Sequence, residues 1–424
     1  MIQGEKYKVL LGNNLDLLAI LEANSVDSIV TDPPYELGFM GKKWDNTGIA
    51  YNVELWKECL RVLKPGGHLL SFGGTRTWHR IAVAIEDAGF EVRDSIAWMY
   101  GSGFPKSLDI AKAIDKQSGY QGEVIGVETI DVGMQGGSMH AGRDRKLEDR
   151  EIKKLSDQAQ QWEGWGTALK PAFEPIIVAR KPLIGKVAEN VLTYGTGALN
   201  IDGSRIGTEE RTLAPMKSFG ILDRSSFPNA DKQESTTVQG RWPANVILDE
   251  HTAGLLDEQS GDRPRGGGNK NSSNRTGLFG NLGAGNGQGM GGDSGGASRF
   301  FYVAKASKRD RNEGLEGLDD TSSRRYGDRN AGSLPKQTPQ GEVRSKNFHP
   351  TVKPTSLMEY LIKLVTPPNG LVLDPFTGSG STGKAAILSG FRFLGIEMTE
   401  EYFPIIEGRL RHAETQGKEN EGLF

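Results

Sequence analysis

The feature that most constrains the fold is a short apolar run that passes through a glycine-rich turn into a helical pattern. Residues 371–374 (Leu-Val-Leu-Asp) have the pattern of a buried strand, and residues 384–388 that of a helix. Between them, Gly378, Gly380 and Gly383 have the spacing G-x-G-x-x-G in the strand–turn–helix context that this motif requires. Without side chains, these glycines let a ligand approach the backbone at a helix N-terminus. The segment predicts a Rossmann-like α/β sheet.

An acidic residue after the next apolar run favours a nucleoside ligand. Glu397 follows the run 393–396 and lies 19 residues after Gly378. In dinucleotide-binding folds, an acidic side chain at this place binds ribose hydroxyls. A phosphate-binding ATPase loop is a weaker match, because Ala385 stands where that motif needs a Ser or Thr for Mg²⁺. A nicotinamide-dependent dehydrogenase would use the same glycines.

A second motif, Asp-Pro-Pro-Tyr at residues 32–35, follows another strand pattern at residues 26–30. Both prolines fix φ and donate no backbone N–H, so the segment is expected to form an exposed turn. The turn presents the carboxylate of Asp32, the carbonyl of Pro33 and the ring of Tyr35. A planar exocyclic amine, with two N–H donors and a π-face, would fit these groups. A dehydrogenase does not account for this motif, and a proline-rich turn with a packed tyrosine is the structural alternative.

Together the two motifs resemble those of the S-adenosylmethionine-dependent amino-methyltransferases of nucleic acids. Residues 374–382 (Asp-Pro-Phe-Thr-Gly-Ser-Gly-Ser-Thr) resemble the methionine pocket of that family, and residues 32–35 resemble its amine-binding loop. The cofactor motif follows the catalytic motif by 342 positions. This order is similar to that of the permuted DNA methyltransferases called beta. It argues against RNA and protein-glutamine methyltransferases, which usually carry the cofactor motif first and Asn at the position of Asp32.

The resemblance implies roles for individual residues. A flipped-out base would stack on Tyr35, while Asp32 and the Pro33 carbonyl accept its amine N–H bonds. Adenine N6 is the implied acceptor, because the family tends to have Asp in this motif for adenine and Ser for cytosine; cytosine N4 is the alternative. S-Adenosyl-L-methionine is the implied cofactor. The implied catalytic residues are Asp32, Pro33, Pro34 and Tyr35, and the implied cofactor-binding residues are Asp374, Pro375, Phe376, Gly378, Ser379, Gly380, Glu397 and Lys353.

Neighbouring segments extend the resemblance. Residues 349–354 (His-Pro-Thr-Val-Lys-Pro) are similar to a segment that closes the methionine end of the family's pocket. A helix is expected over 355–365, with Ser356 and the glutamate three residues later spaced as a capping box. A helix over 53–63 turns into a strand, as the family usually has after its catalytic motif. One departure is Gly-Asn-Asn at residues 12–14, where the family often has Gly-Asp; Asn can still hydrogen-bond an adenine ring.

Composition favours a soluble cytoplasmic protein without disulfides. The 424 residues suffice for two domains and include one cysteine, no signal-like start and no apolar run of about 18 residues. The formal net charge of −3 excludes a general polycation, so DNA contact requires a local basic face. No Cys/His cluster has zinc spacing, and no metal site is expected. Cys59 lies in a helical pattern and is expected to pack, which favours direct attack by an exocyclic nitrogen over thiolate catalysis.

The chain is expected to divide into a catalytic part, a central insert and a cofactor part. A mainly polar, helical stretch is expected over 106–165, and strands at 96–100, 175–179 and 299–305. Glycine makes up 14 of the 36 residues from 261 to 296, which predicts a disordered or lid-like loop. The expected parts are 1–105 (with 166–182) for the catalytic part of the methyltransferase domain, 106–345 for a target-recognition insert, 346–412 for the cofactor-binding part, and 413–424 for a frayed tail.

A basic run lies near the end of the expected insert. Lys305, Lys308, Arg309 and Arg311 fall within seven residues. Such a run is usually a solvated face, but beside a motif for bases, phosphate contact with double-stranded DNA is the better interpretation. A restriction endonuclease is a candidate partner, and a monomer or homodimer without membrane contact is expected. A non-catalytic, sequence-specific DNA-binding module is the alternative of another class, although the intact motifs count against it.

Overall fold

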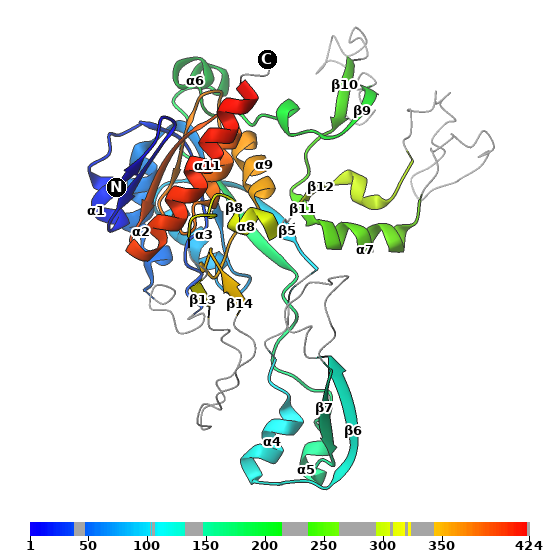
Figure 1. Cartoon of the computed structure of the whole chain (residues 1–424). Helices are drawn as coiled ribbons and strands as arrows, with labels where there is room; N and C mark the ends of the chain where they lie inside the picture. The colour runs from blue at the N-terminus through cyan, green and yellow to red at the C-terminus, as the bar shows by residue number, and fades with distance from the viewer. Residues whose placement is uncertain are drawn as a thin grey trace, which may run out of the picture. The chain divides into compact units, whose positions relative to one another are not determined.

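The protein is described by a computed structural model, which forms two compact units (Figure 1). The larger unit comprises Met1–Trp98 and Glu174–Phe424, and the smaller one comprises Met99–Phe173. The described residues are 1–37, 47–101, 103, 107–131, 147–213, 236–262, 294–305, 308–318, 321–323 and 343–421. Most of the glycine-rich stretch 261–296 therefore lies outside the described residues.

The larger unit is built on a ten-stranded sheet that takes strands from both ends of the chain. The order across the sheet is β1-β2-β16-β15-β3-β4-β8-β5-β11-β12. The strands are β1 (Ile2–Gln3), β2 (Tyr7–Leu11), β3 (Val26–Thr31), β4 (Leu63–Phe72), β5 (Glu91–Met99), β8 (Phe173–Arg180), β11 (Val246–Asp249), β12 (Tyr302–Ala304), β15 (Leu371–Asp374) and β16 (Arg392–Glu397). The expected Rossmann-like α/β fold is confirmed.

The two sequence motifs follow adjacent parallel strands at the centre of this sheet. β15 pairs with β3 in parallel, with Val372 opposite Ser28 and Leu373 opposite Ile29. β16 continues the parallel order on the other side of β15, and β4 does so beyond β3. Because parallel strands end at the same edge, the glycine loop after β15 and the proline-rich turn after β3 leave the sheet side by side. The two motifs, which are far apart in the sequence, therefore meet at one edge of the sheet.

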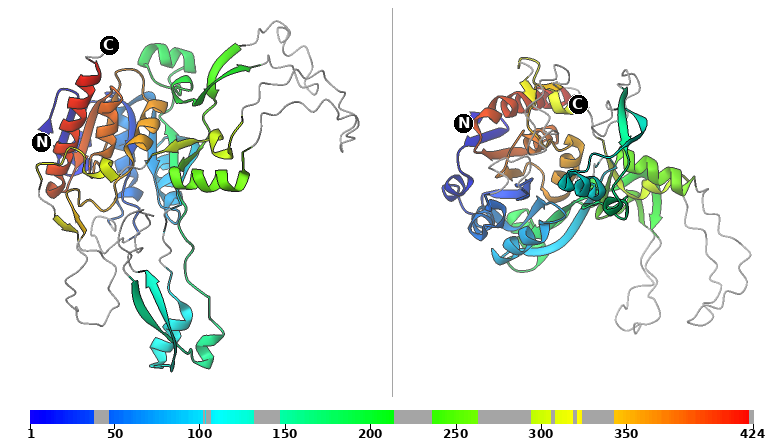
Figure 2. Two further views of the ribbon diagram at one scale, coloured as in Figure 1. Left: turned by 45° about the vertical axis from the view of Figure 1, so that its right-hand side comes forward. Right: turned by 90° about the horizontal axis from the view of Figure 1, so that it is seen from below.

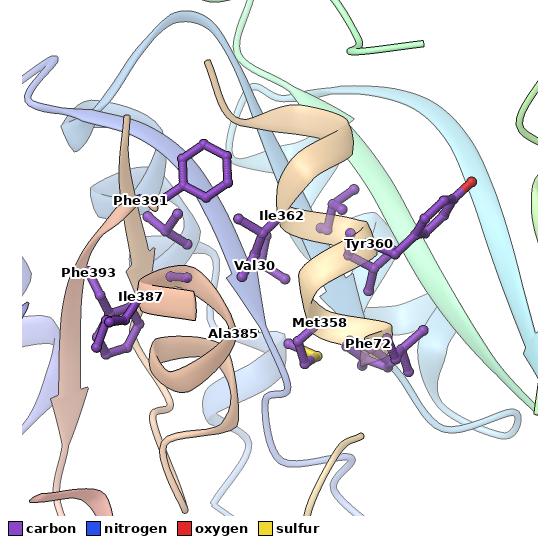
Figure 3. Close-up of a cluster of buried hydrophobic side chains, with 14 of the residues drawn as sticks. Val30, Phe72, Met358, Tyr360, Ile362, Ala385, Ile387, Phe391 and Phe393 are labelled. Atoms are coloured by element: carbon purple, nitrogen blue, oxygen red, sulfur yellow. The ribbon is translucent and has the colours of Figure 1, made fainter. Parts of the chain in front are cut away.

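Hydrophobic packing covers both faces of the sheet, as buried parallel strands require. Side chains alternate along β3, so Val30 belongs to one buried cluster and Ile29 to the other. Figure 3 shows the first cluster, in which Ile362 lies near Val30 and Ile387 lies near Phe393. The helices of this unit are α1 (Asn14–Ala19), α2 (Val53–Val62), α3 (Trp78–Asp87), α6 (Val187–Tyr194), α7 (Glu250–Ser260), α8 (Lys308–Asn312), α9 (Thr355–Val365), α10 (Ser381–Leu388) and α11 (Phe403–Glu421).

The start of α9 differs from its expectation, although the helix itself spans the predicted residues. Its N-cap is Pro354, and no side chain of the helix caps it. The carboxylate of Asp310 accepts instead from Thr355 N at 2.8 Å, while Ser356 Oγ donates to the carbonyl of Lys305 at 2.8 Å. The predicted capping box is therefore wrong, because a distant residue from α8 satisfies the first turn.

Three further local expectations are corrected. The stretch 106–165, predicted to be mainly helical, contains α4 (Ile110–Ser118) and α5 (Asp157–Gln160) but also a hairpin of β6 (Val124–Asp131) and β7 (Leu147–Lys153), visible in Figure 2. The strand expected at 299–305 is shorter, because a 3₁₀ helix, η8 (Ala297–Phe300), precedes β12. The tail expected to be frayed from residue 413 is helical as far as Glu421, where α11 ends, and residues 422–424 lie outside the described residues.

The compact units divide the chain differently from the sequence-based domains. The smaller unit ends at Phe173. β8 lies in the segment 166–182, which was expected in the catalytic part, and it belongs to the main sheet; β11 and β12 from the expected insert belong to that sheet as well. The larger unit also holds β9 (Ile206–Leu213) paired with β10 (Thr236–Arg241), and β13 (Thr321–Ser323) paired with β14 (Val343–Ser345). Among the described residues, no helix has the length and apolarity needed to cross a membrane.

Candidate active site

The Asp-Pro-Pro-Tyr segment begins where β3 ends, and both oxygens of its carboxylate are held. Tyr35 Oη donates to Asp32 Oδ1 at 2.8 Å, and Lys353 Nζ donates to Asp32 Oδ2 at 2.8 Å. The Asp32 side chain retains 20% exposure, Pro33 is buried and Pro34 is half-buried. Because a carboxylate offers about four lone-pair positions, Asp32 can still accept a further N–H donor.

A second carboxylate, Glu174 near the start of β8, joins this cluster and was missed by the sequence reasoning. Its Oε2 accepts from Tyr35 Oη at 3.0 Å and lies 3.1 Å from Lys353 Nζ. β8 runs antiparallel to β4, with Ile176 opposite Phe72, so its first residues lie at the edge where β3 and β4 end. The signal in the sequence was an acidic residue at the head of an apolar strand pattern.

The charge of the cluster follows from its burial and its partners. Burial alone would lower the pKa of Lys353, but Asp32 and Glu174 outweigh it and raise that pKa above its ordinary value. Burial, followed by the same two carboxylates, raises the pKa of the Tyr35 phenol well above its ordinary value. At neutral pH the cluster therefore contains one ammonium group, one neutral phenol and two carboxyl groups.

The glycine loop between β15 and α10 is held by Glu397 at the end of β16. Glu397 Oε2 accepts from Gly378 N at 2.7 Å, and its Oε1 accepts from Thr399 N at 2.8 Å. Gly378 has φ of +54° and Gly380 has φ of +77°, in the left-handed region that glycine adopts readily. Burial raises the pKa of Glu397, against the opposing effect of these N–H bonds. Glu397 therefore fixes the backbone of the glycine loop at Gly378 and lies next to that loop.

Asp374, the last residue of β15, supports the loop from within the sheet. Its Oδ1 accepts from Thr31 Oγ1 at 2.6 Å and from Phe376 N at 3.0 Å, and its Oδ2 accepts from Thr382 Oγ1 at 2.6 Å. Burial raises the pKa of Asp374 to about 6, although these bonds act in the opposite direction. The carboxylate thereby joins the end of β3, the turn and the first turn of α10.

The remaining loop positions are held from two helices. Asn13 accepts from Leu15 N at 2.9 Å and so caps α1, while Asn14 Nδ2 donates to the Pro375 carbonyl at 3.4 Å. Arg409 of α11 donates to the Ser379 carbonyl at 2.7 Å and to Ser379 Oγ at 3.0 Å. The departure at residues 12–14 thus places an amide, not a carboxylate, against the cofactor loop.

The segment before α9 links the glycine loop to the Asp32 cluster. His349 Nδ1 donates to the Thr351 carbonyl at 2.5 Å, and a Cβ built on Gly378 would lie 3.0 Å from His349 Nε2. Burial lowers the pKa of His349 to about 4, so the imidazole is neutral at pH 7. Four residues further on, Lys353 contacts Asp32. One short segment therefore contacts both motifs.

The basic run does not form one described surface. Lys305 is exposed, and the side chains of Lys308 and Arg309 lie outside the described part of the structure. Arg311 turns toward the cofactor segment, where Nε donates to the Asn347 carbonyl at 3.2 Å and Nη2 to the His349 carbonyl at 2.5 Å. Arg311 thus positions the His349 segment.

Two alternative chemistries find no support in the geometry. Lys384, the counterpart of an ATPase-loop lysine, is 1% exposed, and its Nζ lies 2.8 Å from Asp310 Oδ1 and 2.9 Å from Glu313 Oε2. These ion pairs hold its charge away from any phosphate. Cys59 is fully buried in the core, and burial raises the pKa of its thiol, which disfavours a thiolate nucleophile.

The fold and the site together match a family of known proteins. A family model described as DNA methylase, of the N6/N4 type, matches residues 26–408. This range covers most of the chain and includes both motifs, Glu174 and Lys353. The chain therefore belongs to the N6/N4 DNA methylase family.

Shorter segments are similar to curated bacterial enzymes. The DNA adenine methyltransferase YhdJ of Escherichia coli (strain K12) is 50% identical over 54 residues, which cover 13% of this chain and 18% of YhdJ. The type II methyltransferase M.HpaI of Haemophilus parainfluenzae is 36% identical over 106 residues, which cover 24% of this chain and 34% of M.HpaI. The chain thus spans about a third or less of the length of these relatives. Among solved structures, the cytosine-N4-specific PvuII DNA methyltransferase is 13% identical, with a TM-score of 0.43 over 98% of this chain and 93% of that one.

Proposed function

We propose that this chain transfers a methyl group from S-adenosyl-L-methionine to the exocyclic N6 of adenine in double-stranded DNA. One observation carries the proposal: the Asp32 carboxylate and the glycine loop follow adjacent parallel strands, β3 and β15. An acceptor for an amine therefore lies beside a loop suited to a nucleoside. Membership of the N6/N4 family supports this activity. Asp rather than Ser at position 32 favours adenine, and cytosine N4 is the alternative acceptor.

The glycine loop fits a cofactor that carries a nucleoside. Gly378 and Gly380 leave the backbone open at the start of α10, where a Cβ would otherwise project. The lone pairs of Glu397 that do not bind Gly378 and Thr399 can accept ribose hydroxyls. Met398, which is 59% exposed, adds an apolar surface next to Glu397 for an adenine ring. The order of the motifs supports the permuted arrangement of the family.

The Asp32 cluster would hold the target amine for attack. S-Adenosylmethionine supplies a methyl group on a sulfonium, so the amine lone pair forms the C–N bond, the C–S electron pair goes to sulfur and one N–H proton leaves to solvent. Asp32 and the Pro33 carbonyl would accept the two N–H bonds, which turns the nitrogen lone pair out of conjugation with the ring and toward the methyl group. The half-buried ring of Tyr35 offers a face on which the base can stack.

A target base would have to leave the duplex to reach these groups, at a cost of a few kcal/mol in lost stacking and pairing. We assign target recognition to the central residues 106–345, which include most of the smaller unit and the basic run beginning at Lys305. A non-catalytic DNA-binding module predicts a different outcome. It would bind DNA, and even the cofactor, without methyl transfer.

Transfer of labelled methyl to duplex DNA, together with calorimetric titration of the cofactor, tests the proposal. Asp32→Ala should lower transfer by at least about 100-fold, because the amine loses its acceptor, while cofactor affinity is unchanged. Asp87→Ala, at an exposed position of α3, is the matched control and should behave like wild type. Near-wild-type transfer by Asp32→Ala would remove Asp32 from the mechanism. DNA binding without any transfer by wild type would favour the binding module.

A further inference from the structure

Lys353 and the three side chains around it form a cluster whose charges do not balance. Lys353 Nζ lies 2.8 Å from Asp32 Oδ2, 3.1 Å from Glu174 Oε2 and 3.1 Å from Tyr35 Oη. The Lys353 side chain is only 8% exposed, and each carboxylate side chain is 20% exposed. One ammonium between two carboxylates leaves a formal charge of −1 at the site where the proposed function places the amine.

Lys353 on its own would work against the proposed reaction. An ammonium bonded to Asp32 cancels the negative charge that the carboxylate would offer to the incoming amine. That amine gains positive charge as its lone pair forms the C–N bond, and it keeps this charge until an N–H proton leaves to solvent. A neutral Asp32–Lys353 pair would stabilise this change poorly, because the favourable and unfavourable interactions nearly cancel.

We propose that Glu174 is a positioning residue that offsets the charge of Lys353 and orients Tyr35, so that Asp32 faces the amine in a cluster with a net negative charge. This inference rests on the proposed function. A single atom of Glu174 makes both contacts: its Oε2 accepts from Tyr35 Oη and lies beside Lys353 Nζ. Lys353 in turn lies between two carboxylates that would otherwise repel each other.

Two other ionisable groups are coupled electrostatically to Asp32, and both are the same in every variant compared below. Asp374 is buried, and its oxygens accept from two threonine hydroxyls and a backbone N–H. Its pKa is raised to about 6 by burial, with a smaller contribution from Asp32. His349 is neutral at pH 7, because burial lowers its pKa to about 4. Asp374 is mostly ionised at pH 7 in wild type and variants alike, so differences in rate between them report the balance between Lys353 and the two carboxylates.

Single-turnover methyl transfer, measured against pH for a cycle of variants, tests this role. Glu174→Gln keeps the shape of the side chain but leaves a neutral cluster, and the rate constant should fall by about 10- to 100-fold with unchanged cofactor affinity. Lys353→Met leaves two facing carboxylates without the cation between them, so the ratio of its rate to that of wild type should rise with pH. The double variant restores a charge of −1 and should be faster than Glu174→Gln alone.

Glu91→Gln is the matched control. Glu91, on β5, also forms an ion pair with a residue of β8: it lies 2.6 Å from Arg180, at the end of β8 opposite to Glu174. It should transfer methyl like wild type. A double variant slower than both single variants would show additive structural damage and overturn the proposal, as would a wild-type rate for Glu174→Gln.

The failure of this inference is distinct from failure of the proposed function. If wild type transfers methyl and Glu174→Gln matches it, the charge role of Glu174 is wrong while the activity stands. If wild type transfers no methyl to DNA, the activity itself is wrong and the inference falls with it. Should Glu174→Gln unfold in a thermal scan, the pH profile of Lys353→Met decides the matter: a profile parallel to that of wild type overturns the proposal.

Discussion

Lys353 Nζ lies 2.8 Å from Asp32 Oδ2, although 321 positions separate the two residues. The contact forms because β15 and β3 pair at the centre of the sheet, so the C-terminal part of the chain returns to the edge from which Asp32 projects. His349, in the same segment as Lys353, lies against Gly378. The segment 349–353 therefore connects the expected amine site to the expected cofactor site.

Replacement of Glu397 should weaken cofactor binding. Glu397→Ala removes the acceptor of Gly378 N and Thr399 N and any bond to a ribose, at a cost of roughly 1.5–3 kcal/mol in binding free energy. Calorimetric titration with S-adenosylmethionine measures the change directly. Glu400→Ala, an exposed neighbour in η9 (Glu400–Tyr402), is the control and should bind like wild type. Equal affinities for both variants would place the cofactor elsewhere.

A pair of glycine variants separates backbone strain from ligand access. Gly380 and Gly390 have φ of +77° and +82°, a region that costs a β-branched residue about 1–2 kcal/mol in folding free energy. A Cβ at either position meets no atom closer than 3.5 Å, so Gly380→Val and Gly390→Val should lose similar stability in urea unfolding. Only Gly380→Val should also lose cofactor affinity, because it alone lies in the loop. An equal affinity loss in both would indicate general destabilisation.

Salt dependence of DNA binding tests the basic run. Each phosphate contact contributes a slope of about −0.9 in log K against log salt, so neutralising Lys305, Lys308 and Arg309 together should flatten the slope by up to about 2.7. Cofactor affinity should not change. Arg311→Gln is the contrasting variant: its guanidinium binds two backbone carbonyls, so we expect weaker cofactor binding with little change in slope. An unchanged slope in the triple variant would make the run an ordinary solvated surface.

The free energy of unfolding should depend on pH in part through His68. Burial, aided by Arg180 and Arg93, lowers the pKa of His68 to about 4 in the folded chain. The unfolded chain binds this proton first, so stability is lost as the pH falls from about 6.5 toward 4. As the pH is lowered from 7 to 4, the free energy of unfolding of His68→Gln should rise by up to about 3 kcal/mol relative to that of wild type, as measured by chemical denaturation. A difference between the two proteins that does not vary with pH would contradict this assignment.

Sequence patterns predicted the central sheet well, because its strands and helices are locally encoded. The runs at 371–374 and 355–365 became β15 and α9 with the expected bounds. Residues 124–131 and 147–153 were misread, because their polar composition resembles a solvated helix and their strands are defined by pairing with each other. Cross-strand partners are not visible in a local pattern.

The candidate site was proposed from its motifs, and the contacts around them were not foreseen. Asp32 and the glycines could be proposed because they belong to continuous motifs. Glu174 was missed, since its place in the cluster depends on β8 returning antiparallel beside β4. Arg311 was interpreted as a phosphate contact, but its folded neighbours are two backbone carbonyls of a segment 36 and 38 positions away. Such contacts arise from topology rather than from spacing.

Analysis of modified bases in host DNA after expression tests the central claim most directly. DNA from cells that express wild type, Asp32→Ala or Asp87→Ala would be sequenced by a method that detects methylated bases and digested for nucleoside mass spectrometry. The account predicts N6-methyladenine at one recurring sequence for wild type and Asp87→Ala, and none for Asp32→Ala. N4-methylcytosine in its place would contradict the choice of base, and unmodified DNA in all three would contradict the proposed methyl transfer.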